Sequence, residues 1–128
     1  MTKPKAPRTF DEFVRAFPEL GKAWDLLGRA SRSGPLPPKV CELVKLGVAI
    51  ASRSEGAVHS AVRKSHAAGA SVAELQQILS LCASTVGLPS TVAAYTWMRD
   101  EFGAASMRPK RAERLAAPSS RVRPRKGK

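Results

Sequence analysis

The stretch from Pro38 to Gly69 constrains the fold of this chain most strongly. Its first half, PKVCELVKLGVAIAS, places apolar residues on nearly every side of a helix. A helix that is apolar all round lies at the centre of its fold or of an oligomer. A break at Arg53 and Ser54 precedes a second helix that ends at Gly69, since glycine suits the left-handed turn after a helix. The stretch therefore predicts two helices around which the other segments pack.

The segments on either side of this stretch also show helical spacing. Apolar residues recur three and four positions apart over 10–30, over 72–86 and over 89–102. Thr9 or Asp11 is predicted to cap the first helix, and Ser71-Val72-Ala73-Glu74 matches a capping box. No segment alternates between apolar and polar residues as a strand does. The sequence therefore predicts an all-α bundle of about five to six helices.

The positive charge is concentrated at the C-terminal end of the chain. Residues 104–128 hold nine of the 22 Lys and Arg residues and one of the ten acidic residues, so they carry +8 of the net charge of +12. We expect a flexible N-terminus over 1–8, a helical domain over 9–103 and a disordered basic tail over 104–128. Such a tail either keeps the protein in solution or makes nonspecific contacts with the phosphates of nucleic acid or anionic lipid.

Two further features bear on location and cofactors. No apolar run reaches the roughly 18 residues that a membrane-spanning helix needs, and the basic N-terminus lacks the apolar core of a secretory signal, so we expect a cytoplasmic protein. Cys41 and Cys82 lie far apart in the sequence, on two different helices, and form neither a Cys-x-x-Cys pair nor a clustered metal site. We expect small core thiols here, with no metal and no cofactor, although a redox role stays open.

Glu42 is an acid inside the most apolar helix of the chain. A carboxylate in such surroundings needs a cationic partner, which Lys45, Arg53 or Arg63 could supply. Glu42 is therefore either the acid of a pocket or half of a structural ion pair.

Glu55 and His59 lie four residues apart and therefore share one helix face. A carboxylate beside an imidazole is an arrangement typical of general acid–base chemistry, but also of an exposed pair or an intersubunit contact. Ser54 is expected to cap this helix. We interpret Glu42, Glu55 and His59 as candidate catalytic residues, and Arg53, Ser54 and Arg63 as candidate substrate-binding residues.

The order of these signals resembles the carboxymuconolactone decarboxylase family, which includes the alkyl hydroperoxidase D-like proteins. The resemblance covers residues 10–102 and rests on three features: the Glu in an apolar helix, the following helix that ends Ala-Gly-Ala-Ser, and the Gly-Leu-Pro helix junction. It implies an all-helical fold that assembles as a homotrimer or a homohexamer.

The resemblance also implies a specific loss. Peroxidases of the family carry the Glu, then Cys-x-x-Cys-x-x-x-His at the start of the next helix. Glu42 matches the Glu, whereas Ser54, Ala57 and Ala61 stand where the two cysteines and the histidine are expected. Peroxide reduction needs an attacking thiolate and a second thiol, and serine and alanine provide neither. The sequence therefore predicts a divergent member that is not a peroxidase of the family type.

Three functions are compatible with these observations. The chain binds or transforms a small organic acid or lactone by acid–base chemistry at the helix junction. Alternatively, it is a noncatalytic helical oligomer whose basic tail contacts nucleic acid or a protein partner. The third, a peroxidase or antioxidant activity through Cys41 or Cys82, is disfavoured on chemical grounds.

Overall fold

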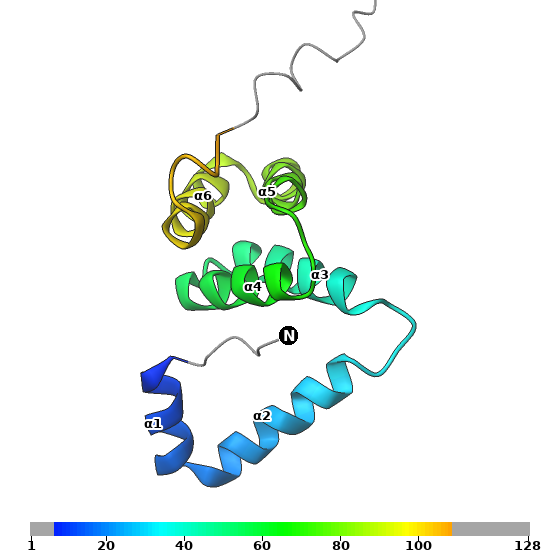
Figure 1. Ribbon diagram of the computed structural model, residues 1–128, viewed down its shortest axis with the longest axis vertical. Helices are drawn as coiled ribbons and strands as arrows, with labels where there is room; N and C mark the ends of the chain where they lie inside the picture. The colour runs from blue at the N-terminus through cyan, green and yellow to red at the C-terminus, as the bar shows by residue number, and fades with distance from the viewer. Residues whose placement is uncertain (1–6, 109–128) are drawn as a thin grey trace, which may run out of the picture.

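The computed structural model describes residues 7–108, and in this part of the chain it contains six α-helices and no strand (Figure 1). The predicted all-α class is confirmed for these residues, at the upper end of the expected number of helices. The helices are α1 (Arg8–Ala16), α2 (Pro18–Ser31), α3 (Pro38–Ala51), α4 (Glu55–Ala67), α5 (Val72–Val86) and α6 (Leu88–Phe102).

Helices α3 to α6 form the packed body of the molecule. α3 and α4 lie side by side in one layer, and α5 and α6 cover one face of that layer (Figure 1). The buried residues of α4 recur with helical spacing, which turns one face of the helix into the core. The largest fully buried side chains of α3 to α6 are Leu46, Ile50, Val58, Val62, Ser65, Leu75 and Met98. The stretch that the sequence placed at the centre of the fold is thus the centre of the body.

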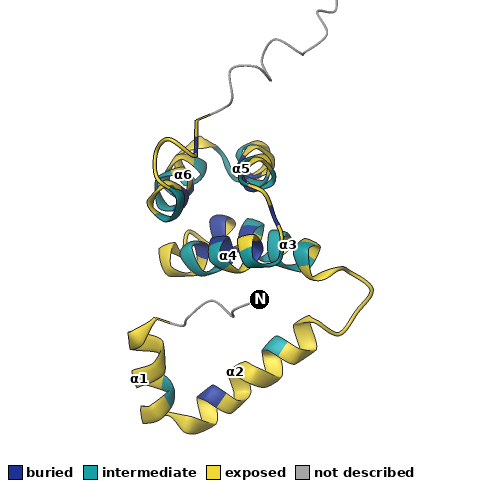
Figure 2. Cartoon of the chain, viewed as in Figure 1, coloured by how far each residue is buried: buried dark blue, intermediate teal, exposed yellow. Residues whose placement is uncertain are grey.

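Helices α1 and α2 form a hairpin that stands apart from this body (Figure 2). Gly21 is the only residue of the two helices that is buried, and a Cβ atom placed there would lie 2.6 Å from Cγ1 of Val14. The glycine therefore lets α1 approach α2 closely. Large apolar side chains elsewhere in the hairpin, such as Phe17 and Trp24, remain half exposed.

The ends of the helices follow local signals, with one exception. Ser54 caps α4 and accepts a hydrogen bond from the Ala57 amide at 3.4 Å, as predicted. The capping box of Ser71 and Glu74 at the start of α5 is also confirmed. The predicted cap of α1 is wrong, because the helix begins directly after Pro7 and already includes Thr9 and Asp11.

The chain packs back onto the body after α6. Met107 is buried, and its carbonyl oxygen accepts a hydrogen bond of 2.7 Å from Nε2 of Gln76 on α5. Met107, which belongs to the predicted tail, therefore contacts the helical body. Residues 109–128 of that tail and most of the predicted flexible N-terminus lie outside the described residues. Between residues 7 and 108, no helix has the length and apolarity that crossing a membrane requires.

Candidate functional site

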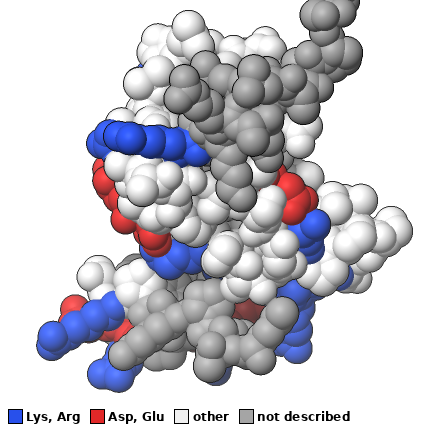
Figure 3. All heavy atoms as spheres, turned by 45° about the horizontal axis from the view of Figure 1, so that its top comes forward, with Lys and Arg blue, Asp and Glu red and all other residues white. Residues whose placement is uncertain are grey.

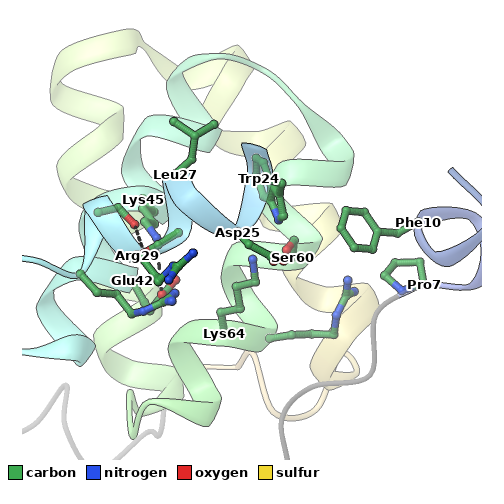
Figure 4. A pocket seen from close by; sticks show the side chains of 14 residues that line it. Pro7, Phe10, Trp24, Asp25, Leu27, Arg29, Glu42, Lys45, Ser60 and Lys64 are labelled. Carbon is green, nitrogen blue, oxygen red and sulfur yellow. Dashed lines mark hydrogen bonds and ion pairs between the residues drawn. The ribbon is translucent and has the colours of Figure 1, made fainter. Parts of the chain in front are cut away.

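A cavity of about 880 Å³ lies between the α1–α2 hairpin and the α3–α4 layer (Figure 4). Its walls come from both parts of the molecule, so residues distant in the sequence meet there. α3 and α4 contribute polar and charged residues, whereas the hairpin contributes aromatic, apolar and basic residues together with Asp25 and Ser31. The lining residues are Pro7, Phe10, Trp24, Asp25, Leu27, Gly28, Arg29, Ser31, Arg32, Glu42, Lys45, Ser60, Arg63 and Lys64.

Glu42 lies at one end of this cavity, near Lys45 and Arg29 (Figure 4). Its side chain is only 15% exposed, and its Oε1 atom is 3.7 Å from Nζ of Lys45. Its Oε2 atom is buried and has no hydrogen-bond partner among the described residues. A buried carboxylate oxygen without a partner is unfavourable unless a ligand or a proton satisfies it. Lys45 is thus the cationic partner of Glu42, from the three that the sequence left open.

The cavity carries an excess of positive charge. Five of its lining residues are Lys or Arg and two are acidic. Lys64 of α4 reaches across to the hairpin, where its Nζ atom lies 5.8 Å from the centroid of the Trp24 ring. A cation over an aromatic face is attracted by the negative charge of that face. The walls therefore favour an anionic occupant.

His59 belongs to a second polar cluster, between α4 and α6. Its Nδ1 atom lies 2.7 Å from Oε1 of Glu101, and NH1 of Arg63 donates a hydrogen bond of 2.8 Å to the same oxygen. Glu55, which the sequence paired with His59, lies 3.6 Å from its Nε2 atom and is mostly exposed. The shared face of Glu55 and His59 is thus confirmed, but the closer partner of the imidazole is Glu101.

The sequence interpretation did not include Glu101 among the site residues. A signal for it was present, because Glu101 follows Trp97 and Met98 by four and three residues and so lies on the inward side of α6. What the sequence could not show is that α4 packs against this side of α6. Arg63 joins the two sites, since it lines the cavity and also binds Glu101.

The structure divides the six predicted site residues into two groups. Glu42 and Arg63 line the cavity, whereas Arg53, Ser54, Glu55 and His59 are not among its lining residues. Arg53 is exposed and occupies the left-handed region at the α3–α4 turn, with φ of 55°. Ser54 acts as the helix cap.

The two cysteines lie on neighbouring helices of the body. Cys41 is half-buried and its Sγ atom is 3.5 Å from the carbonyl oxygen of Leu36, whereas Cys82 is buried. Burial raises the pKa of the Cys82 thiol above its ordinary value, which disfavours the thiolate that a peroxidase needs. In residues 7–108, no group of three or more His, Cys, Asp and Glu side chains is placed to hold a metal ion.

On the face drawn in Figure 3, Lys and Arg side chains lie in several separate places, most of them beside acidic side chains. A protein that binds nucleic acid through its folded surface presents a continuous basic patch instead. The part of this face that grey atoms leave visible in Figure 3 therefore shows no continuous basic patch.

Comparison with known proteins gives one match. The model of the carboxymuconolactone decarboxylase family matches residues 18–100, which is more than half of the chain. No curated protein and no solved structure matches this sequence. The matched region runs from the start of α2 into α6 and includes most residues of both polar sites.

Proposed function

Because the chain belongs to the carboxymuconolactone decarboxylase family, we propose that it binds and transforms a small organic acid or lactone in the cavity between the hairpin and the α3–α4 layer. Glu42 is the proposed acid–base residue. The observation that carries the proposal is the buried, unpartnered Oε2 atom of Glu42 on the wall of a positively charged cavity.

The proposed step is a proton transfer at carbon. When a bound acid loses carbon dioxide, the carbon–carbon bond breaks and its electron pair stays on the ligand. The carboxyl group of Glu42 donates a proton to that carbon and takes a proton back from water. Lys64 and the N–H groups of Arg63 that do not bind Glu101 hold the anionic groups of the ligand, which fixes their distance to Glu42.

Glu42→Gln tests this proposal, because the amide keeps the shape of the side chain but cannot deliver a proton. Carboxymuconolactone is the first probe, and released carbon dioxide is the readout. We expect Glu42→Gln to lower turnover at least a hundredfold, whereas Glu19→Gln, on an exposed position of α2, leaves it unchanged. Equal turnover by wild type and Glu42→Gln would exclude Glu42 as the acid–base residue.

The roles of Glu55 and His59 are tested in the same assay. They stay candidate catalytic residues only if a second copy of the chain, or movement of the hairpin, brings a ligand to them. His59→Gln with unchanged turnover would restrict the chemistry to the cavity. A loss of turnover comparable to that of Glu42→Gln would place His59 in the reaction.

We propose further that the chain assembles with copies of itself, as a homotrimer or homohexamer. α3 presents Val40, Val44 and Val48 as a stripe of increasing exposure, and Val48 is 63% exposed. Burial of such a stripe against another copy stabilises an assembly. Analytical ultracentrifugation measures the mass, and Val48→Glu is expected to dissociate the assembly. Sedimentation of the wild type as a monomer at micromolar concentration would contradict this proposal.

The distribution of charge favours one alternative, a noncatalytic oligomer whose tail contacts nucleic acid or a protein partner. The segment 104–128 carries +8 of the net charge. Removing residues 109–128, which keeps the buried Met107, should then abolish salt-dependent binding to a DNA duplex. Unchanged binding by the truncated chain would exclude the tail as the DNA contact.

A further inference from the structure

We infer that the occupant of the cavity is an aromatic carboxylic acid whose ring stacks on Trp24 and whose carboxylate binds Lys64. This inference rests on the proposed function, because it assigns a ligand class to the same cavity. It depends on three observations: the aromatic wall, the position of the Lys64 ammonium, and the size of the space.

The aromatic wall comes from the hairpin. Trp24 and Phe10 both line the cavity, and neither is buried, with 53% and 36% of their surfaces exposed. Two partly exposed aromatic side chains on one wall provide flat faces for a planar apolar group, with the Lys64 ammonium near the Trp24 ring. An aliphatic dicarboxylate would leave both faces in contact with water.

Lys64 provides a positive charge near Trp24 that can bind the carboxylate of the ligand. Its ammonium is directed toward the Trp24 ring, and Ser60 and Asp25 line the same cavity (Figure 4). Within the described residues, Lys64 forms no ion pair with a carboxylate, whereas Lys45 is near Glu42 and Arg63 binds Glu101. Lys64 can therefore bind a ligand carboxylate without breaking an existing ion pair.

The space is larger than a single small ring requires. A cavity of about 880 Å³ is toward the upper end of the roughly 300–1,000 Å³ that ligand pockets occupy. The lining from Phe10 at one end to Glu42 at the other accommodates a ring on Trp24 together with a polar group near Glu42 (Figure 4). The ligand thus combines an aromatic body with an acid at one end.

Tryptophan fluorescence tests this inference on the full chain. Trp97→Phe leaves Trp24 as the single tryptophan, so its emission reports on the cavity. The probes are phenylacetate, phenylacetamide, which has the ring without the charge, and succinate, which has the charge without the ring. We expect phenylacetate to change the emission saturably and to bind at least tenfold more tightly than either of the other two.

Variants then separate specific binding from general attraction to a basic protein. Lys64→Met is expected to weaken phenylacetate binding at least tenfold. Lys22→Met, which removes the same charge from an exposed position of α2 outside the cavity, should change it less than twofold. Calorimetry should show weak phenylacetate binding by Trp24→Leu. Binding by Trp24→Phe should be close to that of the wild type, because phenylalanine keeps an aromatic ring at this position. Circular dichroism confirms that each variant is folded.

The inference is overturned if succinate binds as tightly as phenylacetate, if no probe binds, or if Lys22→Met weakens binding as much as Lys64→Met. Failure of this inference can be distinguished from failure of the proposed function. Loss of lactone turnover in Glu42→Gln without any binding of phenylacetate would leave the function standing and exclude the aromatic ligand. Binding that depends on Lys64, together with turnover that does not depend on Glu42, would do the reverse.

Discussion

The body of α3 to α6 and the hairpin of α1 and α2 show the same helical spacing of apolar residues, yet they bury them differently. Leu46 and Ile50 in α3 are fully buried, whereas Leu20 and Leu27 in α2 are 53% and 63% exposed. The spacing thus determines that a segment is helical and which of its faces is apolar. Whether that face is covered depends on the rest of the molecule, and in the hairpin it borders a cavity or remains open.

The largest expected difference between the body and the hairpin is in the free energy of unfolding when one leucine in each is replaced by alanine. Leu46→Ala should lower the free energy of unfolding by about 3 kcal/mol, since it removes a fully buried side chain and leaves a cavity. Leu27→Ala should lower it by less than about 1 kcal/mol. Urea unfolding at one protein concentration measures both. Equal losses would show that the apolar face of the hairpin is covered in solution, as assembly with other copies predicts.

The next effect concerns the ion pairs between α4 and α6. Glu101→Ala should lower the free energy of unfolding by about 1–2 kcal/mol, because His59 and Arg63 lose a shared, partly buried carboxylate. Glu55→Ala is the control: its carboxylate is mostly exposed and 3.6 Å from His59, so the loss should stay below about 0.5 kcal/mol. If Glu55→Ala has the larger effect, the closer contact with Glu101 is not the stabilising one.

Ser65 provides a test within the body of α3 to α6, because it is a buried polar residue. Its hydroxyl is fully buried on α4 and has no hydrogen-bond partner among the described residues. Ser65→Ala should therefore leave the free energy of unfolding unchanged or raise it by about 1 kcal/mol. Thermal melting of Ser65→Ala beside Ser60→Ala, which alters the cavity wall instead, measures the difference. A clear loss of stability in Ser65→Ala would reveal a partner for the hydroxyl.

Lys64→Met examines how the hairpin is held against the body. The contact between Lys64 and Trp24 crosses the cavity, and cation–π contacts at exposed sites contribute about 0.5–1 kcal/mol. We expect Lys64→Met to lower the global free energy of unfolding by about 0.5 kcal/mol at most. It should accelerate amide hydrogen exchange more in α1 and α2 than in α3 to α6. Equal acceleration in both regions would mean that the hairpin and the body open as one unit.

The sequence predicted most of the fold because its signals are local. The helix break at Ser54, the capping box at Ser71 and the central apolar helix all depend on residues within a few positions of one another. The candidate site was predicted only in part. Glu42 was found because an acid in an apolar helix is conspicuous in the sequence, but the aromatic wall and Glu101 come from segments whose packing no local pattern specifies.

The smallest effect concerns the helix caps, which also differ between the two regions. α1 and α2 begin without a side-chain cap, whereas α5 begins with the capping box of Ser71 and Glu74. The hydrogen bond from the Ser71 amide, assisted by Lys39, lowers the pKa of Glu74 in the folded state. Since the folded pKa is the lower one, this contribution to stability is present above the pKa of the unfolded chain.

The contribution of Glu74 is therefore lost as the pH falls through the folded pKa. Glu74→Gln should reduce stability slightly at pH 7 and should flatten the fall in melting temperature between pH 5 and pH 3, because the amide does not titrate. Glu12→Gln in α1 is the matched control, since this carboxylate is exposed and its one ion pair within residues 7–108 is with Arg8. It should leave the fall in melting temperature between pH 5 and pH 3 unchanged. Equal flattening by both variants would show that the acid sensitivity comes from net charge rather than from the cap of α5.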